Sequence, residues 1–333
     1  MDNPPVAVRS RARRALAAVA AVVTVTTTVL VGGTGGPTEA APEAAAAVAV
    51  AADTGAYVQS ESWVNGRTLD LTISSPSTER STAKVRLLLP TGWSKTAGRT
   101  WPTLFLLHGG FDNYKSWYDN TDIENLVANR QVIVVLPDTS WCSAYSDWWN
   151  YGSGGRPKWE TFVMTEITQI LSRGYRANGR RAIGGNSMGG LGSMKLAANH
   201  PADFAAAAAF SGNVDPLHQY PGSSGNDKPG LACLADWKRV WGDPAIPAQR
   251  AIWERNNPWN QAANLRGLSL FLAAGTGDPV ESETLRQAKG LQQRLAGFGI
   301  PVTTHWGTYG HSWTAWNDEL KRAFPQLMTA IGA

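Results

Sequence analysis

The sequence predicts an α/β fold in which a mostly parallel central sheet is covered by helices on both faces. Short apolar runs rich in β-branched residues alternate along the chain with longer stretches of helical pattern. These runs are continuously apolar, as expected for strands that are buried on both faces. No long linker and no shift in composition interrupts residues 53–333, so this part is predicted to form one domain.

Each element is assigned from its local pattern. Seven apolar runs are predicted to be strands: 84–90, 103–109, 131–138, 181–187, 204–212, 268–275 and 302–307. Five stretches between them are predicted to be helices, at about Asp122–Asn129, Trp159–Ser172, Met188–Asn199, Glu281–Ala296 and Trp313–Ala323. The segment from Asn213 to about Pro258 breaks the alternation with Gly, Pro and scattered Trp, and we interpret it as a lid-like excursion over the strand ends.

Residues 1–52 differ from the rest of the chain. Four arginines lie between Arg9 and Arg14, an almost purely Ala/Val/Thr run covers 15–31, and a low-complexity Ala-rich stretch follows. This order is typical of a secretory signal peptide with a small-residue cleavage zone, here between about Ala41 and Ala52. The alternative is an uncleaved N-terminal anchor, although the apolar run is marginal for a stable membrane span.

The composition limits the partners that the protein could have. The chain has a formal net charge of +4, about +3 without the signal, with mixed signs and no basic run in residues 53–333. Nucleic acid is therefore not expected as a partner. No sequence motif for binding zinc or calcium is present, so neither a metal nor a cofactor is expected. We expect a monomer that acts on a small molecule or lipid.

Two cysteines occur, Cys142 and Cys233. Export would place both in an oxidising compartment, where they could form a disulfide. The alternative is a pair of separate buried thiols, and the sequence leaves the two open.

One short motif points to nucleophilic catalysis. The sequence Gly185-Asn186-Ser187-Met188-Gly189 lies between a predicted strand and a predicted helix. A nucleophile on such a turn has a strained backbone, and only very small side chains fit two positions before and after it. The turn also directs the Met188 amide toward a developing oxyanion, where the helix N-terminus adds partial positive charge. Ser187 is therefore the predicted nucleophile, in preference to a polar residue of an ordinary Gly-rich turn.

A serine nucleophile needs a base, and the chain has five histidines. Ligands bind outside the carboxyl ends of parallel strands, so a catalytic residue should directly follow a strand. His311 follows the last predicted strand, where a chain order of Ser, acid and His requires the base. His108 ends an early strand and fits a supporting role beside an oxyanion hole. His200, His218 and His305 are predicted to be structural or solvent-exposed.

The acid that orients His311 has two main candidates. Asp278 directly follows the penultimate predicted strand, and Glu281 begins the next predicted helix three residues later. Glu283 is a more distant third candidate. Each could instead be a carboxylate that stabilises a helix N-terminus.

A second oxyanion donor is expected in the loop after the strand over 103–109. Gly109 and Gly110 allow the backbone to come close to a ligand, and the amide of Gly110 or Phe111 would donate. The alternative is an ordinary Gly turn.

These motifs belong to a longer pattern that resembles the secreted bacterial mycolyltransferases and the related esterase D hydrolases. The resemblance covers most of residues 53–333 and keeps the order and approximate spacing of that family. It is carried by "YSDWW" (145–149), "KWETFVMTEI" (158–167), "AIGGNSMGGLGSMKLAANHPADF" (182–204), "SGNVDP" (211–216), "WGDP" and "WERNNPW" (within 241–259) and "GHSWTAW" (310–316).

The resemblance implies an α/β-hydrolase fold with a lid-like insertion after the sixth strand of that fold. It implies that Ser187 is the nucleophile, His311 the base and the Met188 amide an oxyanion donor. In mycolyltransferases the acid is a helical Glu, which corresponds to Glu281. Esterase D-like members use an Asp just after the strand, which corresponds to Asp278. We favour Glu281 slightly.

Departures from the family concern the substrate. Where mycolyltransferases hold trehalose with an Asp and an Arg, this chain has His108 and Phe111, whereas Trp313 matches a residue of the same sugar pocket. The loop 106–117 resembles that of carboxylesterases, so hydrolysis of an acyl ester is expected more than mycolyl transfer to trehalose. The resemblance thus implies a secreted or cell-envelope serine esterase or acyltransferase with an acyl-ester substrate and a possible sugar acceptor. The alternative is a non-catalytic adhesion or carbohydrate-binding protein on the same fold.

Overall fold

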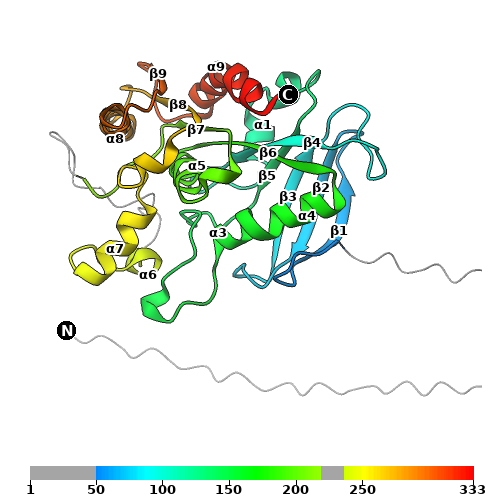
Figure 1. Cartoon of the computed structure of the whole chain (residues 1–333), viewed down its shortest axis with the longest axis horizontal. Coiled ribbons are helices and arrows are strands. Elements are labelled where there is room, and N and C mark those ends of the chain that lie inside the picture. The colour runs from blue at the N-terminus through cyan, green and yellow to red at the C-terminus, as the bar shows by residue number, and fades with distance from the viewer. Residues whose placement is uncertain (1–49, 219–235) are drawn as a thin grey trace, which may run out of the picture. The chain divides into compact units, whose positions relative to one another are not determined.

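A nine-stranded sheet forms the centre of the part of the chain that the computed structural model describes, residues 50–218 and 236–333 (Figure 1). The strand order is β1-β2-β3-β5-β4-β6-β7-β8-β9. The strands are β1 Tyr57–Trp63, β2 Thr68–Ser74, β3 Thr82–Leu88, β4 Trp101–Leu107, β5 Ile133–Pro137, β6 Ala177–Asn186, β7 Ala206–Phe210, β8 Ser269–Ala274 and β9 Thr303–Trp306. The segment interpreted as a signal peptide lies outside the described residues, apart from its last three positions.

The sheet is parallel from β5 across β4, β6, β7 and β8 to β9, and antiparallel from β1 through β2 and β3 to β5. The predicted mostly parallel α/β sheet is therefore confirmed. The strands β1 and β2 were not predicted. β1 is an exposed edge strand with the polar sequence YVQSESW, and β2 alternates apolar and polar residues, so neither has the continuous apolar run used to find buried strands.

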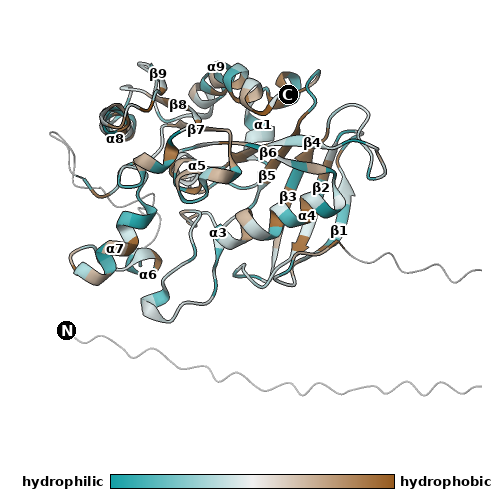
Figure 2. Cartoon of the chain, viewed as in Figure 1, coloured by the Kyte–Doolittle hydropathy of each residue, from teal (hydrophilic) through white to brown (hydrophobic). Residues whose placement is uncertain are grey.

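Helices cover both faces of the sheet (Figure 1). On one face, α4, α5 and α8 share a buried core with the strands; on the other, α1, α2 and α9 share a second core. Hydrophobic residues colour much of the central strands in Figure 2. The helices are α1 Ser116–Asn120, α2 Ile123–Leu126, α3 Trp159–Thr161, α4 Thr168–Gly174, α5 Met188–Asn199, α6 Lys238–Trp241, α7 Pro247–Asn256, α8 Pro279–Gly297 and α9 Trp313–Ile331.

Two predicted helices differ in length from those observed. The helix expected over Asp122–Asn129 is only the four-residue α2. The helix expected to end at Ala323 continues through Pro325 to Ile331, because Leu327, Met328 and Ile331 bury their side chains in the second core. Between α3 and α4, residues Phe162–Ile167 form a π-helix within the predicted helical stretch.

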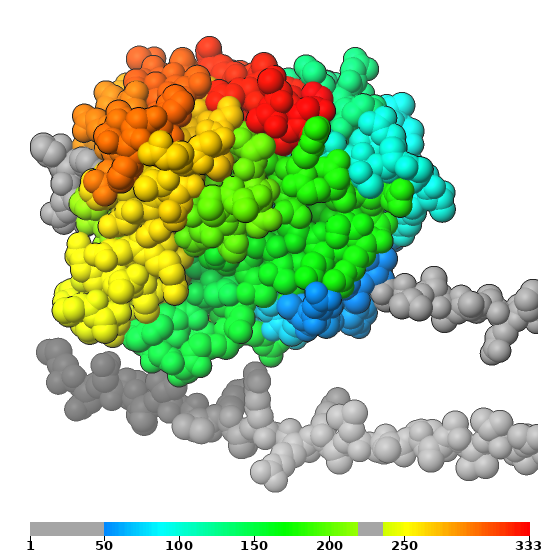
Figure 3. All heavy atoms as spheres, in the orientation of Figure 1, coloured from blue at the N-terminus to red at the C-terminus, as the bar shows by residue number. Residues whose placement is uncertain are grey.

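The predicted lid-like segment contains α6 and α7 where the structure describes it, and residues 219–235 lie outside the described part. Trp241 and Trp253 are buried, and the Trp149 N–H donates to the Val240 carbonyl at 2.9 Å. In Figure 3 this segment, in yellow, lies against the green surface formed by residues near 150–200. Cys142 is buried and disulfide-bonded, whereas Cys233 lies outside the described residues.

Two glycines allow β6 and α5 to meet in a very tight turn. A Cβ atom on Gly185 would lie 2.3 Å from the Gly189 carbonyl oxygen. A Cβ on Gly189 would lie 2.1 Å from the Leu107 carbonyl oxygen at the end of β4. These contacts are with rigid backbone, so the small-residue requirement inferred from sequence has a direct steric cause.

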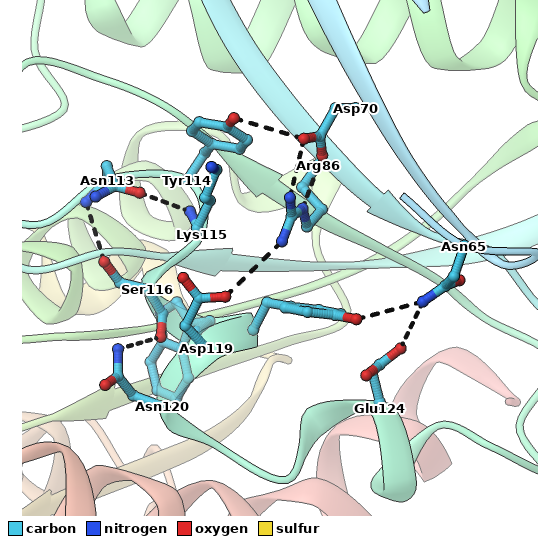
Figure 4. A network of polar contacts seen from close by, with 12 residues as sticks. Asn65, Asp70, Arg86, Asn113, Tyr114, Lys115, Ser116, Asp119, Asn120 and Glu124 are labelled. Atoms are coloured by element: carbon cyan, nitrogen blue, oxygen red, sulfur yellow. Dashed lines mark hydrogen bonds and ion pairs between the residues drawn. The ribbon is translucent and has the colours of Figure 1, made fainter. Parts of the chain in front are cut away.

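A buried ion-pair network anchors the segment after β4 to β2 and β3 (Figure 4). Arg86 makes two bonds to Asp70, Nε to Oδ1 at 2.7 Å and Nη2 to Oδ2 at 2.9 Å. Its guanidinium lies 4.6 Å from the ring centre of Tyr118 and 5.5 Å from that of Tyr114. Asp119 is 4.0 Å from Nη1. Arg86 therefore ties residues 114–119 to the antiparallel side of the sheet.

We expect Gly189→Ala to destabilise the protein by about 1–3 kcal/mol or more, because the added methyl group overlaps the Leu107 carbonyl. Gly179→Ala in β6 is the matched control, since a Cβ there has no atom within 4 Å. Urea unfolding of the two variants measures the difference. Equal stability of the variants would contradict the steric explanation.

We expect Arg86→Ala to lower the free energy of unfolding by about 3 kcal/mol, because it leaves the Asp70 carboxylate, which is 13% exposed, without its ion-pair partner. Lys95→Ala is the control: it removes a pair with Glu61 whose side chains are 46% and 28% exposed, and should cost no more than about 1 kcal/mol. Chemical denaturation compares the two losses. Similar values for both variants would show that Arg86 has no special anchoring role.

Candidate active site

Ser187 occupies the turn between β6 and α5 in a strained conformation. Its φ is +53° and ψ is −118°, outside the regions that L-residues favour. Its N–H donates to the Phe210 carbonyl at 2.9 Å, and its carbonyl accepts from Gly190 and Leu191 in the first turn of α5. These bonds hold the turn, and the half-buried side chain reaches His311.

Ser187, His311 and Glu281 form one continuous chain of contacts. The distance from Ser187 Oγ to His311 Nε2 is 3.0 Å, and from His311 Nδ1 to Glu281 Oε1 it is 2.7 Å. The Glu281 side chain is fully buried, and its Oε2 accepts the Gly275 N–H at 2.6 Å. The edge of the His311 ring also packs against Trp316, with ring centres 4.8 Å apart. The imidazole is therefore held between a carboxylate and a hydroxyl.

Asp278 lies beside this chain but contacts backbone instead of the imidazole. Its Oδ1 accepts the Glu281 N–H at 2.9 Å as the N-cap of α8, and its Oδ2 accepts the His311 N–H at 2.6 Å. Burial acts to raise the pKa of Asp278, but hydrogen bonds from the backbone of Glu281, His311 and Val280, together with the charge of His311, outweigh it, so the net pKa lies below its ordinary value. Of the two acids left open by the sequence, Glu281 contacts the ring, and Asp278 joins the two loops that carry Glu281 and His311.

Backbone amides suited to an oxyanion lie on two sides of Ser187. Met188 begins α5, so its N–H is one of the unpaired donors at a helix N-terminus. In the loop after β4, the Phe111 N–H already donates to the Trp141 carbonyl at 3.0 Å. Of the two amides predicted for this loop, that of Gly110 is thus the better candidate.

The buried His108 side chain holds the same loop through hydrogen bonds. Its Nε2 accepts the Thr139 N–H at 3.2 Å, so Nδ1 carries the proton and donates to the Gly109 carbonyl at 2.8 Å. The side chain is 1% exposed, and burial lowers its pKa to about 4, which keeps the ring neutral. This placement agrees with a supporting role, but it does not suit the predicted direct contact with substrate, because the ring is sealed beneath the loop.

The other two residues predicted to bind substrate are accessible aromatics. Phe111 is 75% exposed, and its ring centre lies 5.0 Å from that of the half-exposed Trp141. Trp313, two residues after His311, is partly buried and packs edge-on against Trp117 and Trp316. Phe111 thus lies on the exposed side of the loop after β4, and Trp313 lies close to His311 in the chain.

Sequence reasoning missed Asp112. A Cβ on Gly109 would lie 2.9 Å from Asp112 Oδ2 and 3.4 Å from the Ser187 Cβ, so this carboxylate approaches the catalytic turn. Burial raises the pKa of Asp112, partly opposed by the neighbouring polar groups of Ser116, Asn186 and Trp313. The only signal for Asp112 in the sequence is its place shortly after Gly109 and Gly110. An acidic residue in such a loop is usually interpreted as solvent-exposed.

The remaining histidines each pair with an acid away from Ser187. His200 Nε2 is 2.8 Å from Glu160, His218 Nδ1 is 2.8 Å from Asp215, and His305 Nδ1 is 2.7 Å from Glu319. Within residues 50–218 and 236–333, no group of three or more His, Cys, Asp or Glu side chains could hold a metal ion. No helix in the same ranges is long and apolar enough to cross a membrane.

Comparison with known proteins identifies the family of the chain. Residues 75–327 match a family model described as putative esterase. Esterase Rv1288 of Mycobacterium tuberculosis is 30% identical over 251 residues, which cover 68% of this chain and 52% of that protein. The chain thus spans about half the length of that relative. The diacylglycerol acyltransferase/mycolyltransferase Ag85B of Mycobacterium leprae is 30% identical over 270 residues, covering 72% of this chain and 79% of that protein.

Solved structures give the same result for the fold. MPT51 (FbpC1) of Mycobacterium tuberculosis superposes with a TM-score of 0.62 at 26% identity, over 77% of this chain and 96% of that chain. An S-formylglutathione hydrolase from Agrobacterium tumefaciens has a TM-score of 0.65 at 20% identity, over 81% and 99% of the two chains, which is evidence for the fold alone. The chain therefore has the α/β-hydrolase fold and belongs to the putative esterase family, as its resemblance to mycolyltransferases and esterase D proteins predicted.

Proposed function

We propose that this protein is a serine esterase or acyltransferase in which Ser187 is the nucleophile, His311 the general base and Glu281 the acid. The observation that carries the proposal is the unbroken series of contacts from Ser187 Oγ through His311 to the buried Glu281, at 3.0 and 2.7 Å. This order of groups activates a serine hydroxyl in unrelated folds. Membership of a family that includes esterases and mycolyltransferases supports the same reaction class.

The reaction proceeds through an acyl-enzyme. His311 Nε2 takes the hydroxyl proton as Ser187 Oγ bonds to the ester carbonyl carbon, and the carbonyl oxygen becomes an oxyanion. The amides of Met188 and Gly110 donate to that oxygen. His311 then gives its proton to the leaving alkoxide oxygen as the carbon–oxygen bond breaks. A water or alcohol attacks the acyl group with His311 again as base, and Ser187 Oγ leaves with the proton.

Glu281 stabilises the imidazolium that forms in both halves of this cycle. Its Oε1 accepts from Nδ1, which keeps Nε2 directed at Ser187. Its Oε2 is held by the Gly275 N–H, so the carboxylate has a defined orientation. Asp278 is a positioning residue, because it contacts only the backbone of the two loops.

Water is the proposed main acceptor of the acyl group. His108 and Phe111 stand in place of the charged pair that holds trehalose in the mycolyltransferases, and the His108 ring is buried. A sugar hydroxyl is the second proposed acceptor, and Trp313 would lie beside the sugar.

We also propose that the protein is exported, because arginines at 9–14 are followed by an apolar run. Residues 53–333 are then the catalytic domain.

Ser187→Ala should abolish hydrolysis of a short-chain nitrophenyl ester, with a loss of about 10³-fold or more, because no other group replaces the nucleophile. The variant should also no longer react with a fluorophosphonate probe. Ser172→Ala, an exposed serine on α4, is the matched control and should keep both activities. Equal hydrolysis by wild type and Ser187→Ala would reject the enzyme in favour of a non-catalytic binding protein.

Glu281→Gln should lower kcat by about 10³–10⁴-fold, because the amide no longer stabilises the imidazolium or selects its tautomer. Asp278→Asn keeps an oxygen acceptor for one of the two backbone N–H groups and should cost about tenfold. Steady-state kinetics on the same ester ranks the two. The reverse ranking would make Asp278 the acid, and two small losses would reject both assignments.

A further inference from the structure

A cleft of about 390 Å³ lies beside the loop that follows β4, on the side away from His311. Its walls come from β2, the start of β3, the end of β5 and the loop after β4. The volume of the cleft is at the low end of the range for pockets that bind small ligands. It is lined by Thr72, Glu79, Arg80, Thr82, Lys84, Asp112, Asp138, Ser140 and Trp141, among others.

The order of the strands fixes how an ester can lie at Ser187. Along the sheet the order is β3, β5, β4, β6, β7, β8, β9. Ser187 follows β6, whereas His311 follows β9 on one side and the cleft adjoins β3 and β5 on the other. His311 must protonate the leaving oxygen, so the alcohol lies on the β9 side. An acyl group directed away from His311 extends toward the loop after β4 and the cleft.

Two contacts connect the cleft with the catalytic turn. Asp112 lines the cleft, and a Cβ on Gly109 would touch both its carboxylate, at 2.9 Å, and the Ser187 Cβ, at 3.4 Å. Trp141 lines the cleft too, and its carbonyl accepts the Phe111 N–H next to Gly110. The proposed oxyanion loop therefore forms the border between Ser187 and the cleft.

The lining is mixed: charged and hydroxyl side chains alternate with apolar surface that includes Trp141 and Trp159. Asp138 is largely buried, and burial raises its pKa to about 6, although the Tyr114 N–H donates to its carboxylate. The acids Glu79, Asp112 and Asp138 face two bases, Arg80 and Lys84, so the charges nearly cancel. Trp141, at 46% exposure, supplies an apolar face. A neutral carbon chain that carries a hydroxyl donor suits this mixed lining, because the tryptophan faces take the carbon atoms and a carboxylate takes the hydroxyl.

We propose that this cleft is the acyl subsite and that it selects acyl groups bearing a distal hydroxyl, which donates to Asp138 while the carbon chain packs on Trp141. The proposal rests on the proposed function, since it concerns the acyl half of the same reaction. It also separates the two halves of the substrate: the alcohol lies near Trp313 and the acyl group near Trp141.

The test compares nitrophenyl hexanoate with its ω-hydroxyhexanoate analogue, two esters that share one leaving group. In the wild type, kcat/KM should be about tenfold higher for the hydroxylated ester, as expected for a hydrogen bond to a carboxylate. Asp138→Asn and Trp141→Ala should each lower that ratio several-fold. Asn keeps an oxygen for the Tyr114 N–H, and thermal unfolding verifies that both variants fold.

Trp63→Ala is the matched control, because Trp63 is an aromatic residue of similar exposure, 53%, on β1 outside the cleft. It should leave the ratio unchanged. A wild-type ratio near one, or a ratio that neither cleft variant alters, would overturn the proposal. In a second series of esters that share one acyl group and differ in the alcohol, Trp141→Ala should leave the relative kcat/KM values unchanged. If Trp141→Ala alters these values, the cleft binds the leaving alcohol instead of the acyl group.

Failure of the proposed function gives a different result. In that case neither ester is hydrolysed and a fluorophosphonate does not label Ser187, so the acyl-subsite proposal falls with it. If only the subsite is wrong, both esters are hydrolysed and Ser187 is labelled, but the ratio does not respond to the cleft variants.

Discussion

The close approach of α5 to the end of β4 is the constraint on which the rest of the site depends. Gly189 lies so near the Leu107 carbonyl that no side chain fits between them, and Gly185 is equally close to Gly189. This packing holds Ser187 in its left-handed conformation at the sheet edge. It also places the first amide of α5 beside the loop that leaves β4. One steric contact thus aligns the proposed nucleophile with both proposed oxyanion donors.

The proposed base and acid are aligned by a second contact between loops. Asp278 accepts hydrogen bonds from the backbone of Glu281 and of His311, so it joins the loops after β8 and β9 into one unit. Tyr309 reinforces this unit, because a Cβ on Gly275 or Gly307 would lie 2.8 or 2.3 Å from its ring. The small residues at the ends of β8 and β9 therefore admit the aromatic ring that keeps His311 in place.

The loop after β4 divides the carboxyl edge of the sheet into two regions. On one side lie His311 and Trp313, and on the other the cleft lined by Trp141. The loop is braced by the neutral His108 below it and, further along the chain, by Arg86 and its aromatic neighbours (Figure 4). Its position therefore depends on the antiparallel strands β2 and β3, which lie outside the parallel part of the sheet that carries Ser187, Glu281 and His311.

The sequence alone determined the parallel sheet and the family, and it predicted Ser187 as nucleophile and His311 among five histidines as base, because these depend on local patterns and on chain order. It did not reveal the polar edge strand β1, or β2, whose alternating pattern lacks a continuous apolar run, or Asp112, whose position beside Ser187 depends on a neighbour 75 positions later. Only the tertiary structure decided that Glu281 contacts the imidazole, that Asp278 contacts backbone and that His108 is buried. Residues three positions apart at a strand end are equally plausible in sequence, and only the fold of the loop decides which side chain reaches the ring.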